Sequence, residues 1–263
     1  MAFGHQERTT QVHSDDPRNP VVSLKMTGEV KVAVYALPPM LSLGGVMQGE
    51  PMTQSIRLFP SAIPQVDIKS MEFNRSLFTM QNKEIEIRGR KGQEIVVTLN
   101  SALPPGEFKD ELVIGVPNDI PPIRVPIWGA VVTQEEFAKL MKELASEDPD
   151  VRSDAADALG EIHNAASTQP LIQVLLTDKS EEVRSSAADA LGMKQATEAL
   201  DALIKATSDP DVLVRDSAVE ALDALGDARA EEALKRALAD EDEMVRESAA
   251  KALENLRRRA ESR

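Results

Sequence analysis

A nine-residue pattern, Val-Arg-x-x-Ala-x-x-Ala-Leu, recurs in the second half of this chain every thirty-one or thirty-two residues. Its four copies begin at Val151, Val183, Val214 and Val245. A fixed period of this length is typical of stacked supersecondary units, because one unit alone cannot bury its apolar face. We therefore predict that the second half is a solenoid, a fold that usually offers partners an extended surface rather than an enclosed catalytic pocket.

Two apolar stripes in each unit predict a pair of helices. Within each copy, apolar residues at i, i+4, i+7 and i+8 form one face of a helix, and another stripe precedes it. Aspartates recur just before the second helix, where a carboxylate can cap free N–H groups, and glycines near its end can turn left-handed. These residues are Asp178, Asp209 and Asp240, and Gly160, Gly192 and Gly226. The pattern predicts four helical hairpins over residues 133–258.

The repeated units resemble the HEAT-like repeats named after phycobilisome lyases, whose pattern is close to D-x-D-x-x-V-R-x-x-A-A-x-A-L-G. The resemblance covers nearly all of residues 133–258. In that family the arginine commonly pairs with an acidic residue of a turn, and the pairs form a ladder between repeats. The resemblance therefore implies a structural ladder, rather than a ligand site, at Arg152, Arg184, Arg215 and Arg246.

The composition changes sharply near Val132. Thirteen of the sixteen prolines and seven of the eight aromatic residues precede it, and short β-branched or alternating runs replace the helical stripes. Turn clusters such as Leu103-Pro104-Pro105-Gly106 separate these runs. Short strands with regular turns are typical of an all-β sandwich, which we predict for the first half.

A second repeat lies within the first half, because residues 20–30 match residues 121–131 at an offset of 101. The stretch Ser14-Asp15-Asp16-Pro17-Arg18-Asn19-Pro20 resembles the closing motif of bacterial immunoglobulin-like modules of the ASH (Hydin-like) type, and Leu37-Pro38-Pro39 resembles their opening strand. The chain is therefore expected to begin inside a longer ancestral architecture. The predicted organisation is a remnant terminal hairpin at 1–30, an immunoglobulin-like β-sandwich at 31–132, the HEAT-like α-solenoid at 133–258 and a tail at 259–263.

Charge and composition exclude several classes of function. Residues 1–132 carry thirteen Lys and Arg against fourteen Asp and Glu, whereas residues 133–263 carry seventeen against thirty. An acidic solenoid repels phosphate backbones, so we expect no nucleic-acid partner. The sequence contains no cysteine and no run of eighteen apolar residues, which excludes disulfides and predicts no membrane span. The start resembles no signal peptide, and the compartment stays open, with the cell envelope possible if the true N-terminus is missing.

An enzymatic function is disfavoured but kept as an alternative. HEAT-like repeats occur in bilin lyases and in di-iron deoxyhypusine hydroxylases, but only His163 of the three histidines lies in the repeats here. That number is too small for a di-iron site, and we expect His163 at a helix end. Phe137 is the only aromatic residue of the repeats, whereas a tetrapyrrole needs aromatic walls. We expect no cofactor and no metal, with a lyase-like or oxidoreductase-like protein acting on a tetrapyrrole as the alternative.

The clearest candidate for binding is a stripe six residues after each motif valine, where the second helices carry Asp157, Asp189, Glu220 and Lys251. Second helices of stacked hairpins line one face, so these side chains are predicted to form a mainly acidic docking surface for a basic protein segment. The alternative is a solvated face that keeps the protein soluble. We predict a non-enzymatic, bacterial interaction or scaffold protein that binds its partners through this acidic face, the β-module or both. A structural link in a tandem array of β-modules is a further alternative.

Overall fold

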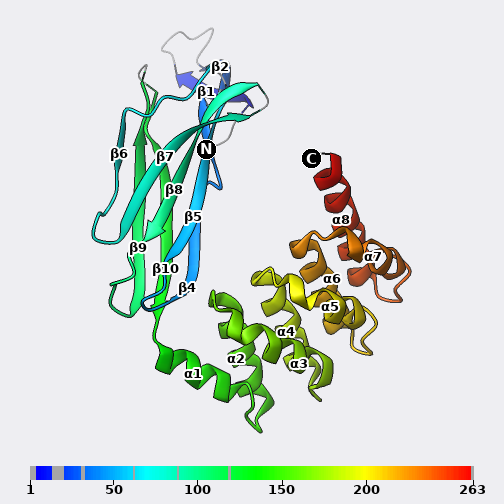
Figure 1. Cartoon of the computed structure of the whole chain (residues 1–263). Coiled ribbons are helices and arrows are strands. Elements are labelled where there is room, and N and C mark those ends of the chain that lie inside the picture. The colour runs from blue at the N-terminus through cyan, green and yellow to red at the C-terminus, as the bar shows by residue number, and fades with distance from the viewer. Residues whose placement is uncertain are drawn as a thin grey trace. The chain divides into compact units, whose positions relative to one another are not determined.

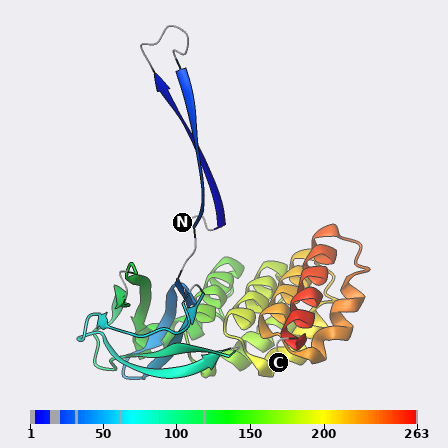
Figure 2. The same cartoon turned by 90° about the horizontal axis from the view of Figure 1, so that it is seen from above.

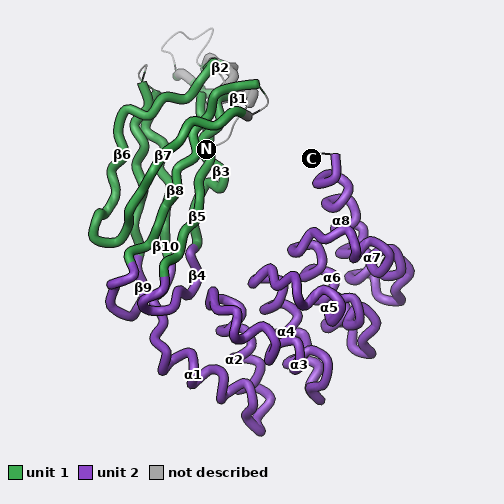
Figure 3. The backbone as a smooth tube through the Cα atoms, in the orientation of Figure 1, with its two compact units in different colours: residues 1–42, 51–100, 109–128 green, residues 43–50, 101–108, 129–263 purple. Residues whose placement is uncertain are grey.

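The computed structural model describes residues 4–13, 21–30, 33–61, 63–87, 89–117 and 120–261. The chain divides into two compact units (Figure 3). Unit 1 comprises residues 1–42, 51–100 and 109–128, and unit 2 comprises residues 43–50, 101–108 and 129–263. Unit 2 therefore contains all of the described helices together with three short segments of the β-rich first half, residues 43–50, 101–108 and 129–132.

The strands of the first half form two four-stranded sheets (Figure 1). One sheet has the order β3 (Val34–Leu37), β5 (Met52–Pro60), β8 (Arg90–Leu99) and β7 (Phe78–Ile87). The other has the order β4 (Leu41–Met47), β10 (Ile123–Val132), β9 (Gly106–Gly115) and β6 (Ser70–Glu72). Alternate side chains are buried, as the period of a strand requires, among them Ile56, Leu58, Leu112, Ile114, Val125 and Ile127. The predicted strands of the first half are confirmed, and the immunoglobulin-like arrangement stays a prediction.

The first two strands, β1 (Gly4–His13) and β2 (Val21–Val30), pair with each other as a separate antiparallel sheet (Figure 2). Their bounds correspond to those of β9 and β10 at an offset of 102, one residue more than the offset between the matching sequences. The hairpin therefore lies where the internal repeat predicts one. The motif 14–20 lies outside the described residues, and the remnant of a preceding module stays a prediction.

The second half consists of four helical hairpins, so the predicted α-solenoid is confirmed. Short 3₁₀ turns at Ala165–Ser167, Thr197–Ala199 and Ala228–Ala230 lead into the later outer helices. The outer helices are α1 (Gln134–Glu143), α3 (Thr168–Thr177), α5 (Leu200–Ala206) and α7 (Glu231–Ala237). The inner helices are α2 (Pro149–Glu161), α4 (Glu181–Met193), α6 (Val212–Leu225) and α8 (Glu243–Glu261). Because α8 continues to Glu261, it includes most of the predicted tail.

Local capping explains where the helices begin. Strand β10 ends at Val132, and Thr133 then caps α1 through a capping box with Glu136. Asp148 and Asp211 accept hydrogen bonds from backbone N–H groups at the starts of α2 and α6. The strand thus passes into the first helix through a single capping residue.

The glycines of the repeat have two different roles. Gly226 ends α6 in the left-handed conformation, with φ at 61°, as the sequence predicted. For Gly160 and Gly192 that prediction was wrong, because both lie inside their helices. A Cβ atom on Gly160 would lie 2.7 Å from the Cα of Ala190, and one on Gly192 would lie 2.8 Å from the Cα of Ala221. These two glycines let successive inner helices touch.

A β segment covers the first helical hairpin within unit 2. Gly45 forms an isolated parallel bridge with Ile162, and the His163 N–H donates to the Gly45 carbonyl at 2.8 Å. Met47 is 1% exposed and belongs to the same hydrophobic cluster as the buried helical residues. The change from strand to helix occurs at residues 132–134, as expected. The boundary between the two compact units lies elsewhere, because unit 2 also includes residues 43–50 and 101–108. Residues 43–50 pack on the helices because the first hairpin has an apolar face to cover.

Candidate functional site

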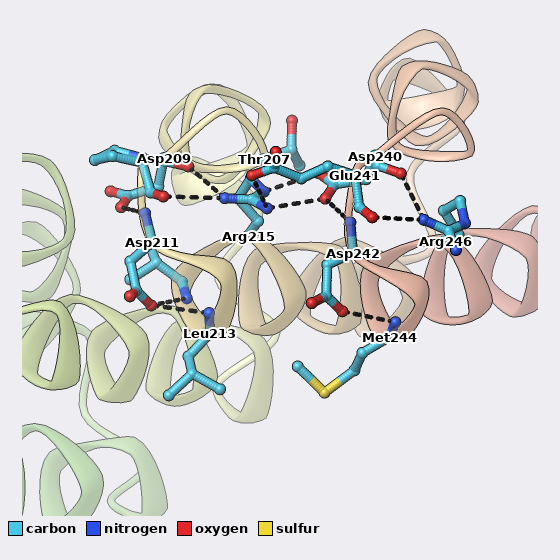
Figure 4. Close-up of polar contacts among 12 residues, drawn as sticks. Thr207, Asp209, Asp211, Leu213, Arg215, Asp240, Glu241, Asp242, Met244 and Arg246 are labelled. Carbon is cyan, nitrogen blue, oxygen red and sulfur yellow. Dashed lines mark hydrogen bonds and ion pairs between the residues drawn. The ribbon is translucent and has the colours of Figure 1, made fainter.

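Three of the repeat arginines connect each hairpin to the next. Arg152 donates from Nε and Nη2 to both carboxylate oxygens of Asp178 at 2.7 and 2.8 Å. Arg184 contacts Asp209, and Arg215 contacts Asp240, with the same two-pronged geometry. Each aspartate also accepts the N–H two residues ahead of it, which fixes the turn in which it lies. These pairs form a ladder along the solenoid and leave little of each guanidinium for a ligand. Figure 4 shows the pair of Arg215 with Asp240.

The pairs are mostly buried, with side-chain exposure of 9% for Arg215 and 10% for Asp240. The hydrogen bond from Arg215 is the main cause that holds the pKa of Asp240 below its usual value. Arg246 of the last hairpin differs, because its Nη1 donates only to the carbonyl oxygens of Asp240 and Glu241 (Figure 4). Among the described residues it forms no ion pair.

The inner helices α2, α4, α6 and α8 lie side by side (Figure 1). Hydroxyl pairs cross the first two interfaces, joining Ser153 to Ser186 at 2.9 Å and Ser185 to Ser217 at 2.8 Å. Asp216 replaces the serine in the next repeat, and its Oδ1 is buried without a hydrogen-bond partner. An uncompensated carboxylate oxygen therefore interrupts this polar row.

The predicted acidic residues of the first three repeats line one groove of about 750 Å³. Asp157, Asp189 and Glu220 contribute carboxylates from three successive inner helices, and Glu161 adds a fourth. No lysine or arginine lines the groove in the part of the chain that the structure describes. Lys251 is exposed on α8 but does not line the groove, so three of the four predicted residues come together.

Electrostatic repulsion is concentrated at Asp189. Burial is the main cause that raises its pKa to about 6, and the negative charges of Glu220, Asp157 and Asp216 raise it further. A hydrogen bond from Ser217 opposes this shift. Asp189 as a residue is nevertheless exposed, so solvent screens part of the repulsion from its neighbours. The groove therefore holds excess negative charge at neutral pH, and a positive charge placed there would be stabilised.

One acidic member of this site, Glu161, was not predicted from the sequence. The predicted stripe consists of the residues six positions after each motif valine, and Glu161 is not one of them. It reaches the groove because α2 packs against α4. Asp216, which breaks the serine pattern of Ser153 and Ser185, does not line the groove, but its charge acts on Asp189. Met193, which is 56% exposed, adds an apolar contact at the rim.

The described residues offer no arrangement typical of metal chemistry. No three histidine, aspartate or glutamate side chains among them come together as a metal site requires. His163 lies two residues after the end of α2, where its ring faces Gly44. Among the helices of the described residues, none combines the length and the apolar composition that a bilayer crossing demands.

Comparison with protein families gives one match, to a model of HEAT repeats, over residues 137–222 and 168–254. No curated protein matches the chain. A solved structure of the complex of CpcE and CpcF of phycocyanin lyase from Nostoc sp. PCC7120 is 23% identical, with a TM-score of 0.42, over 45% of this chain and 81% of that chain.

Two further solved structures are similar over the same region. Human deoxyhypusine hydroxylase is 25% identical, with a TM-score of 0.42, over 46% of this chain and 43% of that chain. A designed armadillo repeat protein in complex with a (KR)4 peptide is 22% identical, with a TM-score of 0.39, over 46% and 64%. This chain spans less than two thirds of the length of either. With TM-scores below 0.5, these similarities carry no argument about activity or ligand.

Proposed function

We propose that this protein, whose helical region is a HEAT-like repeat array, is a non-enzymatic interaction module that binds a basic segment of a partner protein. The observation that carries the proposal is the groove over α2, α4 and α6. Carboxylates of Asp157, Asp189 and Glu220 meet there without a lysine or arginine in the described lining. A lysine or arginine of a partner supplies the missing positive charge.

The free energy for binding comes largely from charge already assembled in the fold. Asp189 is repelled by Glu220, Asp157 and Asp216, and the Oδ1 atom of Asp216 is buried without a hydrogen-bond donor. A guanidinium or ammonium group in the groove relieves this repulsion and forms charge-assisted hydrogen bonds with the groove carboxylates. The exposed Met193 provides an apolar contact for the aliphatic part of such a side chain.

The sheets of the first half complete this proposal. We assign them to an immunoglobulin-like β-module, on the basis of alternate burial along the strands and of the hairpin that recurs as β1–β2 and β9–β10. In this scheme the β-module is a second contact surface of a bacterial scaffold protein. The repeats provide the charged surface that selects a basic segment.

Fluorescence anisotropy with a labelled eight-residue peptide of alternating Lys and Arg tests the groove directly, with a Glu/Asp peptide as the negative probe. The triple variant Asp157→Lys, Asp189→Lys, Glu220→Lys is expected to lose at least about tenfold in affinity. A matched control reverses three exposed carboxylates outside the groove lining, Glu182→Lys, Glu198→Lys and Asp201→Lys. Equal losses in the two triple variants would show nonspecific attraction to an acidic protein and would contradict the proposal.

Proton release provides an independent readout. A cation in the groove lowers the pKa of Asp189 from about 6. Binding at pH 6 must then release protons, whereas binding at pH 8 releases almost none. Calorimetric titration at pH 6 in two buffers of different ionisation enthalpy measures this release. Identical heats in both buffers would mean that the peptide binds elsewhere.

A further inference from the structure

An exposed apolar pair lies at the starts of α6 and α8. The residue directly before the motif valine is Asp150 in the first copy and Glu182 in the second, as the positive end of a helix dipole favours. The third and fourth copies have Leu213 and Met244 at this position, and these residues are 52% and 41% exposed. Figure 4 shows both side chains on the side of the helices that faces away from Arg215. Neither helix electrostatics nor burial in the core explains why they are apolar.

This position faces solvent even where another hairpin follows, because Leu213 is exposed although α7 and α8 come after it. Its surroundings are acidic. The N–H groups of Leu213 and Met244 donate to the carboxylates of Asp211 and Asp242, and the side chain of Glu241 is 89% exposed. We call this surface the helical ridge, and its members are Leu213, Met244, Asp211, Asp242 and Glu241.

The sheet of β3, β5, β8 and β7 carries another exposed apolar pair. Tyr35 and Leu37 are 47% and 55% exposed, and alternation along β3 places both on the face opposite to the buried Val34. The ring of Tyr35 stacks on the ring of Phe59, with the centroids 5.2 Å apart. The core of the sheets therefore lies on the other face, and this pair is left in contact with solvent.

Two cations border this pair but share one carboxylate. Arg57 lies opposite Leu37 in the pairing of β3 with β5. Its Nε donates to one oxygen of Glu94 at 3.2 Å, and Lys83 contacts the other oxygen at 2.7 Å. The side chains of Arg57 and Lys83 are 58% and 64% exposed, so the surface has a net positive charge. We call it the sheet patch, and its members are Tyr35, Leu37, Phe59, Arg57 and Lys83.

We infer that the sheet patch of one copy of this protein binds the helical ridge of a second copy. The two surfaces are complementary, because each exposes an apolar pair and the charges around the pairs have opposite signs. Tyr35 and Leu37 lie about 7 Å apart along a strand, and neighbouring helices lie about 8–10 Å apart. The two apolar pairs can therefore meet in one interface. Burial of these side chains provides the free energy, and the cations of the patch contact the carboxylates of the ridge.

The patch and the ridge are different surfaces, so the contact is heterologous and each copy has two places to bind a neighbour. The average mass in solution should therefore rise with concentration beyond the mass of a dimer. So small an interface is weak, and we expect a dissociation constant of roughly 10–100 µM. Sedimentation equilibrium of the full chain, up to a concentration of about 1 mM, measures this association.

Two variants test the two surfaces separately. Leu37→Glu places a carboxylate beside Arg57 and cancels the positive charge of the patch. Leu213→Glu combined with Met244→Glu gives the ridge the kind of residue that the first two copies have there, so the helices tolerate the change. Each variant should weaken self-association at least about tenfold. Leu176→Glu, at a residue that is 36% exposed on α3, is the matched control and should associate like wild type.

A mixture of the two variants gives the sharpest test. The patch variant keeps an intact ridge and the ridge variant keeps an intact patch, so together they should form dimers of one copy of each and nothing larger. Circular dichroism confirms that each variant stays folded. Wild type that stays monomeric at about 1 mM, variants that associate like wild type, or a mixture that stays monomeric would each overturn the inference. Because the Lys/Arg peptide tests a groove made of other residues, none of these outcomes decides the proposed function.

Discussion

The inner helices meet at three interfaces, which are built from the same repeat but not from the same contacts. The α2–α4 and α4–α6 interfaces are alike, and the α6–α8 interface differs from both. Eight residues after the ladder arginine, α2 has Gly160 and α4 has Gly192, which let the backbones of adjacent helices touch. At the same position α6 has Asp223, which accepts a hydrogen bond from Asn255 at 2.7 Å. Arg259 also donates to the Asp223 carbonyl at 2.6 Å. The third interface therefore uses a polar contact where the others use close packing.

This difference shows which part of the repeat is interchangeable. The motif valine, alanines and leucine recur in all four copies because they build the core of each hairpin. The residue eight positions after the ladder arginine differs, because Asp223 takes the place of the glycine and accepts a hydrogen bond from Asn255. The acidic groove lies over the two glycine interfaces, with Gly192 and Ala221 in its lining. Close packing there also brings Asp189 and Glu220 together.

The ladder gives the largest expected effect. Arg215→Gln leaves Asp240 largely buried without its charge partner, and we expect a loss of about 3–5 kcal/mol in the free energy of unfolding at pH 7. Arg246→Gln in the fourth hairpin breaks no ion pair among the described residues and should cost less than about 1 kcal/mol. Urea unfolding followed by circular dichroism measures both variants.

The pH dependence sharpens this prediction. The pKa of Asp240 is lowered in the folded state, so the pair stabilises the fold above the ordinary aspartate range and loses this effect as the pH falls through the lowered value. The difference between wild type and Arg215→Gln should therefore shrink in acid. Equal costs for Arg215→Gln and Arg246→Gln at pH 7 would contradict the stabilising role of the Arg215–Asp240 pair.

The opposite end of the solenoid gives the next effect. Met47 lies in a β segment but is buried among helical side chains, so Met47→Ala should cost about 2–5 kcal/mol. The loss should appear in the thermal transition of the helices, followed at 222 nm. Met40→Ala is the matched control, because Met40 is 49% exposed. A helical transition equal to that of the control would mean that residues 43–50 do not support the repeats.

The sequence predicted the solenoid because one period fixes both the helices and the face to which each position belongs. The repeat arginines therefore share one face of the solenoid, and the carboxylates of Asp157, Asp189 and Glu220 share another. The HEAT-like assignment from the same pattern is confirmed by the family model over residues 137–254. The immunoglobulin-like arrangement and the function of the acidic face stay predictions.

Contacts between segments that lie far apart in the chain could not be predicted from the sequence. Nothing in the β-rich half marks Gly45 or Met47 as neighbours of α2, because the bridge to Ile162 joins segments more than a hundred residues apart. Gly160 and Gly192 lie close enough to helix ends to suggest caps, and only the distance to the next helix reveals their packing role. Period and composition specify elements and faces, but not the partner of each face.

A glycine substitution tests the comparison of interfaces directly. In a helix interior, Gly→Ala usually stabilises by about 1 kcal/mol. Gly192→Ala should instead destabilise by about 1–3 kcal/mol, because its Cβ would lie 2.8 Å from the Ala221 Cα. Gly160→Ala should behave alike. Urea unfolding of each variant gives the sign, and a stabilised Gly192→Ala protein would show that the helices can separate at no cost.

The smallest expected effect concerns the groove that those two interfaces create. Asp189→Asn removes a carboxylate that its neighbours repel, so the variant should be slightly more stable than wild type at pH 7, by less than about 1 kcal/mol. Because the pKa of Asp189 is raised to about 6 in the folded state, its ionised carboxylate lowers the stability of the fold above that pH. This cost disappears as the pH falls from 6 to the ordinary aspartate pKa of 3.8, because the carboxylate becomes protonated. The advantage of Asp189→Asn should therefore be present at pH 7 to 8 and vanish near pH 4.

Glu182→Gln, at an exposed position of α4 outside the groove, controls for the loss of one charge. Melting temperatures from pH 4 to 8 measure the difference, and a variant less stable than wild type at pH 7 would mean that the hydrogen bond to Ser217 outweighs the repulsion.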